Sequence, residues 1–186
     1  MSSKNDSPNL IWVDCEMTGL DLNQDVLVEI AVLVTDSELN ILGEGVDLVI
    51  RATEDQLKGM NEFVTNMHTE SGLITEIPNG VETEKAEAEI IAYLEKYAPG
   101  AGKSPLAGNS VGTDRAFIAR DMPLLNAYLH YRTIDVSSIK ELARRWYPRI
   151  YFAAPKKTGN HRALGDIRDS IEELEYYRKA IFIPNN

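Results

Sequence analysis

Apolar and polar residues along this chain follow two periods, first the one typical of strands and then the one typical of helices. Residues 10–13 form an unbroken apolar run that predicts a buried strand, and residues 26–35 predict a second strand. A third strand is expected over residues 41–51. Because short turns join these three segments, we expect them to form an antiparallel meander.

The remainder of the chain alternates shorter strands with helices. The expected elements are an irregular helical stretch at 53–77, a helix at about 83–98, a strand at 106–108, helices after Asp114 and after Pro123, a strand at 131–136, a helix opened by a capping box at 138–141, a loop at 149–159 and a last helix at about 162–182. A meander followed by alternating strands and helices predicts an α/β fold with a mixed sheet flanked by helices.

Length and composition are those of one ordinary globular domain. The chain has 186 residues, of which 44% are hydrophobic and 26% charged. We expect a disordered tail over residues 1–8 and a single domain over residues 9–182. No apolar run is long enough to span a bilayer, and the polar N-terminus does not resemble a signal peptide. The single cysteine excludes an internal disulfide, so we expect a cytoplasmic protein that does not bind membranes.

The formal net charge of −10 restricts the class of partner. Proteins that track long nucleic acids gain much of their affinity by releasing counterions from phosphates, and this requires a basic surface. Adjacent basic residues occur at most in pairs, such as 144–145 and 156–157. A nucleic-acid substrate is therefore expected to be short or held at one end.

The first candidate for chemistry is the pair Asp14 and Glu16, which ends the first strand. Side chains two apart on a strand point to the same face, so the two carboxylates repel each other at the end of a buried strand. A divalent cation with oxygen ligands would relieve that repulsion. The alternative is a solvated strand end with no ligand. Cys15 points to the opposite face and is interpreted as a small core residue in preference to a nucleophile.

Further candidates lie at the starts of two helices. Asp114 follows the short strand at 106–108, and Asp166 lies in the first turns of the last helix, five residues after His161. Acidic residues are also common at helix N-termini for structural reasons, and a lone histidine in a loop is usually structural. Asp135 and Asp169 offer the same chemistry. No single residue decides among these alternatives.

Taken together, the motifs resemble the exonuclease family that uses four acids and one histidine. The motifs that carry this resemblance are Asp14-Cys15-Glu16-Met17-Thr18-Gly19-Leu20, Gly108-Asn109-Ser110 with Asp114-Arg115, and His161-Arg162-Ala163-Leu164 with Asp166. Within that family, three further segments resemble the oligoribonucleases: His130-Tyr131-Arg132, Asp135-Val136-Ser137 and Lys140-Glu141-Leu142-Ala143-Arg144-Arg145-Trp146. The match extends from the first strand to the last helix. One departure is Gly165, where many relatives are expected to carry a second acid.

The resemblance implies a ribonuclease-H-like sheet and a metal-dependent 3′–5′ exoribonuclease. It implies that four acids hold two Mg²⁺ or Mn²⁺ ions: Asp14, Glu16, Asp114 and Asp166. His161 would be the general base, because an imidazole titrates near neutral pH. Very short RNA oligonucleotides, especially dinucleotides, would be degraded from the 3′ end to nucleoside 5′-monophosphates.

The resemblance also implies candidate substrate-binding residues. Leu20 would wedge between the bases and His68 would stack near one of them, whereas a cap on the 5′ phosphate would be formed by Ser110 and Ser137 with Tyr131 and Arg132 of the partner subunit. The active form would then be a homodimer. Without the resemblance, an ordinary turn residue is the preferred interpretation of Leu20, and a strand edge that of Tyr131 and Arg132.

Two other functions are compatible with parts of the same pattern. A proofreading or tRNA-trimming exonuclease of the same superfamily would share the five catalytic positions but would need an open channel and more basic surface. A non-catalytic dinucleotide sensor on the same scaffold could lack a ligand or the base, whereas all five positions are filled here.

Overall fold

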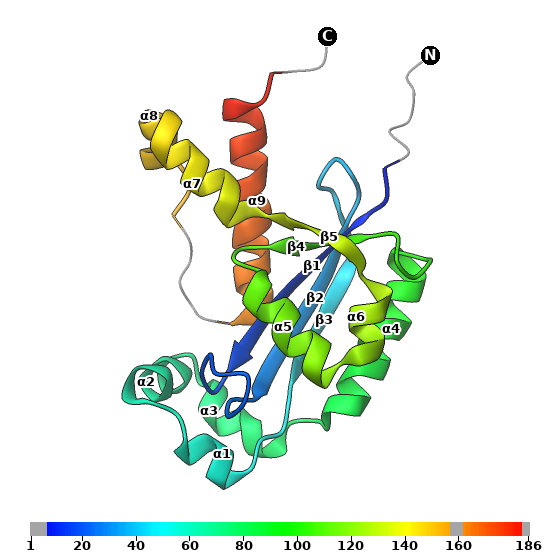
Figure 1. Cartoon of the computed structure of the whole chain (residues 1–186), viewed down its shortest axis with the longest axis vertical. Helices are drawn as coiled ribbons and strands as arrows, with labels where there is room; N and C mark the ends of the chain where they lie inside the picture. The colour runs from blue at the N-terminus through cyan, green and yellow to red at the C-terminus, as the bar shows by residue number, and fades with distance from the viewer. Residues whose placement is uncertain (1–6, 157–161, 184–186) are drawn as a thin grey trace.

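A five-stranded mixed sheet forms the centre of the molecule (Figure 1). The computed structural model describes residues 7–156 and 162–183, so residues 1–6 of the expected tail lie outside the described residues. The strands are β1 (Leu10–Met17), β2 (Leu27–Thr35), β3 (Ile41–Val49), β4 (Pro105–Gly108) and β5 (His130–Asp135). Across the sheet their order is β3-β2-β1-β4-β5; β1, β2 and β3 are antiparallel neighbours, and β1, β4 and β5 are parallel. The predicted α/β mixed sheet and its opening meander are confirmed.

Helices cover both faces of this sheet. They are α1 (Glu54–Lys58), α2 (Glu62–Glu70), α3 (Leu73–Glu76), a 3₁₀ turn (Ile77–Asn79), α4 (Thr83–Tyr97), α5 (Gly112–Asp121), α6 (Pro123–Tyr128), α7 (Val136–Trp146), α8 (Pro148–Phe152) and α9 (Ala163–Ile181). Apolar residues of α4, α5 and α6 form one core against the sheet, and those of α7 and α9 form a second core against its other face. None of these described helices is both long enough and apolar enough to span a bilayer.

Alternation along β1 assigns each side chain to one of the two cores. Ile11, Val13 and Cys15 pack in the core formed with α4, α5 and α6, whereas Trp12 packs in the core formed with α9. Cys15 is therefore buried as predicted, and burial raises the pKa of its thiol well above the ordinary value. The same alternation turns the residues on either side of Cys15 toward the α9 face of the sheet.

The region after β5 differs from the sequence prediction in two places. The helix expected from a capping box at 138–141 begins earlier, because Asp135 is the N-cap of α7 and accepts a hydrogen bond from the Ser137 amide at 2.9 Å. The loop expected at 149–159 contains α8. Pro148 ends one helix as predicted, but proline is also favoured in the first turn of a helix, and here it begins the next one.

Candidate active site

Three carboxylates converge where β1 ends beneath the first turn of α9. One oxygen each from Asp14, Glu16 and Asp166 lies within 4.8 Å of those of the other two. Asp14 and Glu16 are two apart on β1 and so share a face, and Asp166 lies in the first turn of α9. Residues 150 positions apart in the chain are thereby brought close together. Strand alternation predicted the shared face of Asp14 and Glu16, whereas the approach of Asp166 was implied by the family resemblance.

Asp114 lies beside this group and is held there by a hydrogen bond to β1. β4 pairs with β1 only at Ile11 and Trp12, and beyond these residues the Cys15 amide donates instead to Asp114 Oδ1 at 3.0 Å. A glycine is needed at the end of β4, because a Cβ on Gly108 would lie 3.0 Å from the Val13 carbonyl oxygen. Asp114 is thus hydrogen-bonded to the residue between Asp14 and Glu16, although it is not one of the three acids that converge most closely.

The carboxylates are arranged unfavourably for a site without a cation. Glu16 is only 9% exposed, and its pKa is raised to about 8, first by burial and then by the charges of Glu29, Asp166 and Asp114. Burial also raises the pKa of Asp114 to about 6. Folding alone disfavours such a group of buried acids, whereas hard divalent cations prefer oxygen ligands of this kind. The donor set fits a divalent metal site.

A buried ion pair beside this cluster was not recognised from the sequence. Glu29 of β2 lies opposite Glu16 in the β1–β2 register, is fully buried, and accepts from Arg162 Nε at 2.7 Å. The available signal was one glutamate inside the otherwise apolar run 26–34. A buried carboxylate in a central strand requires a partner, and Arg162 is that partner.

His161, the predicted general base, lies outside the described residues. It precedes Arg162 in the chain. Its role stays a prediction.

Leu20 lies on the turn between β1 and β2 with 76% of its surface exposed. The base of this turn is fixed by Thr18, whose hydroxyl donates to Asp25 Oδ1 and accepts from the Val26 amide, both at 3.0 Å. Arg120 of α5 adds a hydrogen bond to the Asp25 carbonyl oxygen at 2.9 Å. An exposed leucine on a fixed turn suits a wedge between two bases, and that role stays a prediction.

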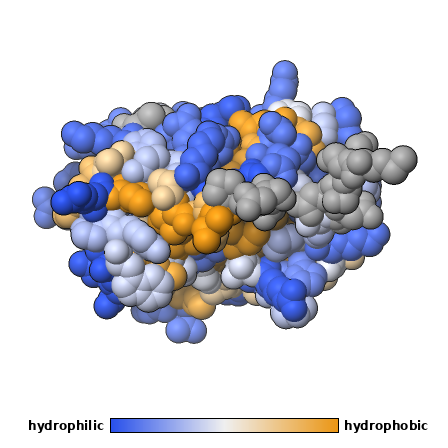
Figure 2. Space-filling view, turned by 90° about the horizontal axis from the view of Figure 1, so that it is seen from above, coloured by the Kyte–Doolittle hydropathy of each residue, from blue (hydrophilic) through white to orange (hydrophobic). Residues whose placement is uncertain are grey.

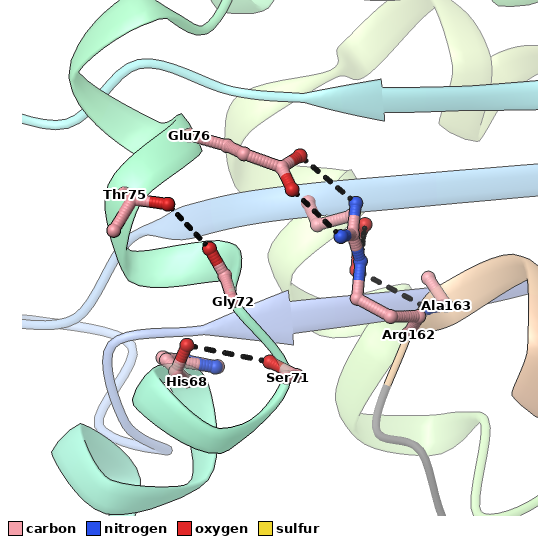
Figure 3. Close-up of polar contacts among 8 residues, drawn as sticks. His68, Ser71, Gly72, Thr75, Glu76, Arg162 and Ala163 are labelled. Carbon is pink, nitrogen blue, oxygen red and sulfur yellow. Dashed lines mark hydrogen bonds and ion pairs between the residues drawn. The ribbon is translucent and has the colours of Figure 1, made fainter.

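His68 has a different setting from the one expected. His68 lies in the last turn of α2 (Figure 3). Its ring is fully buried, and Nε2 lies 2.9 Å from the Met17 carbonyl oxygen. Nδ1 is buried without a hydrogen-bond partner among the described residues. In this conformation the ring presents no surface to a base, so the predicted stacking requires a displacement of α2.

Ser110 and Ser137 lie together between the end of β4 and the start of α7. Ser110 Oγ donates to Ser137 Oγ at 3.0 Å, and Ser137 Oγ donates to Asn109 Oδ1 at 2.9 Å. Both serine amides donate to Asp135 Oδ1, at 3.0 and 2.9 Å. Asp135, one of the alternative acids, therefore orients this hydroxyl pair. The predicted contact of the hydroxyls with a 5′ phosphate remains to be tested.

Tyr131 and Arg132 lie on β5, the strand at one edge of the sheet. Tyr131 is 74% exposed, and the guanidinium carbon of Arg132 lies 5.3 Å from the centre of its ring. An exposed aromatic–arginine pair on an edge strand suits contact with another molecule.

Comparison with known proteins places the chain in a family. Residues 11–174 match the family described as Exonuclease, RNase_T. The chain is 62% identical over 175 residues to an oligoribonuclease of Streptomyces coelicolor, an alignment that covers 94% of this chain and 88% of that protein. An oligoribonuclease of Mycobacterium bovis is 58% identical over 176 residues, covering 94% of this chain and 82% of the relative.

Solved structures show the same fold at low sequence identity. The zinc-bound complex of E. coli exonuclease I with single-stranded DNA matches with a TM-score of 0.71 at 15% identity, covering 94% of this chain. Exonuclease I of Methylocaldum szegediense matches with a TM-score of 0.68 at 18% identity. The chain spans 41% of the length of each of these two exonuclease I chains. The fold is thus ribonuclease-H-like, and the chain belongs to the oligoribonuclease branch of the exonuclease family.

Proposed function

We propose that this protein is a metal-dependent 3′–5′ exoribonuclease that degrades very short RNA, above all dinucleotides, to nucleoside 5′-monophosphates. One observation carries the proposal: three carboxylates within 4.8 Å of one another, in a chain 58–62% identical to oligoribonucleases. The net charge of −10 supports a short substrate, because a long strand would require a basic track.

Asp14, Glu16, Asp114 and Asp166 would hold two divalent ions, Mg²⁺ or Mn²⁺. When bound, two such ions activate a water molecule and stabilise the leaving oxygen of a phosphodiester. The protein's own contribution is to hold the carboxylates together: β1 presents Asp14 and Glu16, and α9 presents Asp166. His161 would take the proton from the attacking water.

Substrate length would be set by residues around this centre. Leu20 would separate the two bases of a dinucleotide, with His68 next to one of them. Ser110 and Ser137 would donate hydrogen bonds to the 5′ phosphate, together with Tyr131 and Arg132 of the partner subunit. A guanidinium and several hydroxyls match a terminal phosphate dianion, and a longer chain would have no room beyond such a cap.

The proposed site requires a homodimer, and the surface offers apolar area for one. Apolar side chains gather on the face at which α9 ends (Figure 2). A groove of about 1140 Å³ there includes Leu39, Ile134 and Phe182 in its lining. Charged residues also line this groove, and two of its apolar side chains, Phe182 and Ile183, are 53% and 90% exposed and suit a contact with another protein. Trp146 of α7 is 66% exposed, and we place it in the same dimer contact although it does not line the groove. We place this dimer in the cytoplasm, whose reducing conditions suit the single buried thiol of Cys15.

Trp146→Glu is expected to dissociate the dimer. A charge placed in a buried apolar contact costs several kcal/mol, which weakens association by about 100-fold or more. Sedimentation velocity at micromolar protein measures the change. Phe63→Glu is the matched control, because Phe63 is an aromatic residue on α2 that is 76% exposed, and its substitution is expected to leave the dimer intact. A wild-type protein that sediments as a monomer would exclude the shared cap.

The proposed function predicts a specific order of cleavage in a ladder of 5′-labelled RNA from two to about seven nucleotides. With Mg²⁺, the dinucleotide is expected to disappear ahead of the longer chains, and chelation is expected to stop all cleavage. Arg132→Ala is expected to raise KM for a 5′-phosphorylated dinucleotide by about tenfold, the cost of a charge-assisted hydrogen bond.

Arg144→Ala is the control for that variant, since Arg144 is an exposed arginine of α7 paired with Glu141. It is expected to retain the wild-type KM. Faster trimming of the longer chains would favour a general 3′–5′ exonuclease and would exclude the capped end. Tight binding of the dinucleotide without any cleavage would identify a sensor instead of an enzyme.

A further inference from the structure

One arginine joins three elements next to the carboxylate cluster. Arg162 is the N-cap residue of α9. Its Nε donates to Glu29 of β2 at 2.7 Å, and its Nη1 and Nη2 donate to the two carboxylate oxygens of Glu76 of α3 at 2.9 and 3.1 Å. Figure 3 shows the guanidinium extending from the start of α9 to Glu76. Both edges of the planar group are therefore used.

Glu29 completes this connection from the sheet. Its second oxygen accepts from the Ala163 amide at 3.1 Å, so Glu29 caps the first turn of α9, a function that the side chain of Arg162 does not perform. Glu29 also lies opposite Glu16 in the β1–β2 register. The strand pair that carries Glu16 is thus bonded directly to the first residues of α9.

This connection lies one helical turn from Asp166. The Asp166 amide donates to the Arg162 carbonyl oxygen at 3.1 Å, and residues three or four apart share one side of a helix. A shift or rotation of the first turn of α9 would therefore move the Asp166 carboxylate relative to Asp14 and Glu16. The Arg162 contacts oppose such a shift from two sides, through β2 and through α3.

Stability alone does not account for this arrangement. Burying an ion pair costs desolvation free energy, and apolar residues of similar volume would often stabilise the protein as well or better. What the fork of Arg162 provides is a defined position, because a guanidinium bonded along two edges cannot rotate without losing hydrogen bonds. Groups that orient metal ligands in this way commonly determine the affinity of the metal.

We propose that Arg162 is a positioning residue of the metal site: by bonding Glu29 and Glu76 at once, it holds the start of α9 so that Asp166 faces Asp14 and Glu16. The proposal rests on the function proposed above only in that the carboxylates bind a divalent ion. Binding of that ion without RNA is therefore the primary measurement.

The test is calorimetric titration of the full chain with MnCl₂, for the wild type, Arg162→Lys, Glu76→Gln and the double variant. Lysine keeps the charge but cannot bond both carboxylates in a fixed plane, so Arg162→Lys is expected to weaken Mn²⁺ binding by about 10- to 100-fold. Glu76→Gln is expected to weaken it by a smaller factor. The double variant is expected to match Arg162→Lys, because the contact with Glu76 is already lost there.

Kinetics on a dinucleotide provide a second measurement. With limiting Mn²⁺, kcat is expected to fall with the metal affinity, whereas KM for the RNA changes by less than about threefold, because Arg162 is not among the proposed RNA contacts. Glu82→Gln is the matched control: it neutralises the glutamate of another Arg–Glu pair, with Arg51 at 2.8 Å, on the exposed surface. Its Mn²⁺ affinity is expected to equal that of the wild type.

The proposal would be overturned if Arg162→Lys bound Mn²⁺ within about twofold of the wild-type affinity but unfolded at a lower temperature. The ion pair would then be purely structural. If Arg162→Lys does not fold, Glu76→Gln decides by the same criterion, since the side chain of Glu76 is half exposed and its neutralisation is expected to leave the protein folded. A wild type that binds Mn²⁺ but does not cleave RNA, with weakened binding in the variants, would support the positioning role while refuting the proposed function.

Discussion

Glu16→Gln is expected to abolish RNA cleavage and at the same time to stabilise the metal-free protein. The change keeps the shape of a side chain that is 9% exposed but removes a charge from among Asp14, Asp166 and Asp114. Loss of about 4 kcal/mol of metal-dependent stabilisation of the transition state lowers the rate about 10³-fold. Without metal, loss of the repulsion is expected to raise the free energy of unfolding by about 1–3 kcal/mol at pH 8.

Single-turnover cleavage of a dinucleotide and urea unfolding in chelator measure the two effects. Glu87→Gln is the matched control, because Glu87 is also a buried glutamate but accepts a hydrogen bond from the Leu125 amide at 2.9 Å, away from the cluster. It is expected to keep its activity and to lose stability. A Glu16→Gln variant that is both inactive and less stable than the wild type would show that the carboxylates are not held against mutual repulsion.

A substitution that abolishes activity but raises the free energy of unfolding is typical of a functional site that folding alone would not form. The structure supports the same view elsewhere in the cluster. Asp114 accepts a hydrogen bond from the Cys15 amide where β4 has separated from β1, and this bond stabilises the fold. Burial of the Asp114 charge, in contrast, destabilises the fold and raises the pKa of the carboxyl. A bound cation would offset the cost of the buried charge while the hydrogen bond is kept.

The sequence was sufficient to predict the parts of this site that depend on local periodicity. Alternation along β1 placed Asp14 and Glu16 on one face, and helix position placed Asp166 in the first turn of α9. The fold class followed from the same patterns, because an apolar meander and alternating strands and helices leave few arrangements. These predictions needed no knowledge of contacts between distant segments.

Tertiary contacts decided what the sequence could not. Glu29 and Arg162 are 133 residues apart, and nothing local to either residue indicates that they pair. Asp135 and Asp114 are of the same chemical type, yet one orients two serine amides and the other bonds to β1. Burial of His68 likewise depends on how α2 packs beside Met17.

Without metal, the stability of the folded protein is expected to fall as pH rises. Glu16 has a pKa of about 8 in the folded protein against an ordinary 4.5, and Asp114 about 6 against 3.8. At pH values between the ordinary pKa and the folded-state pKa of each group, the folded protein binds more protons than the unfolded chain. The free energy of unfolding therefore falls as pH rises. The slope reaches at most about 1.4 kcal/mol per pH unit for each group. Urea unfolding in chelator from pH 5 to 8.5 measures it.

Two further measurements distinguish this mechanism from general acid–base effects. Glu16→Gln is expected to flatten the slope above pH 6, where the pKa of Asp114 has been passed. Carboxylates whose pKa is lowered, such as Glu141 with a pKa of about 2, change the free energy of unfolding only below pH 5. Mn²⁺ at 100 times its Kd for pH 8 is expected to add about 2.7 kcal/mol at that pH. The same Mn²⁺ concentration is expected to add less at pH 5, because binding requires deprotonated carboxylates. A metal-free protein whose stability is constant from pH 5 to 8.5 would contradict the buried charge cluster, whereas a fall that Mn²⁺ reverses would mean that the ion completes the folded state.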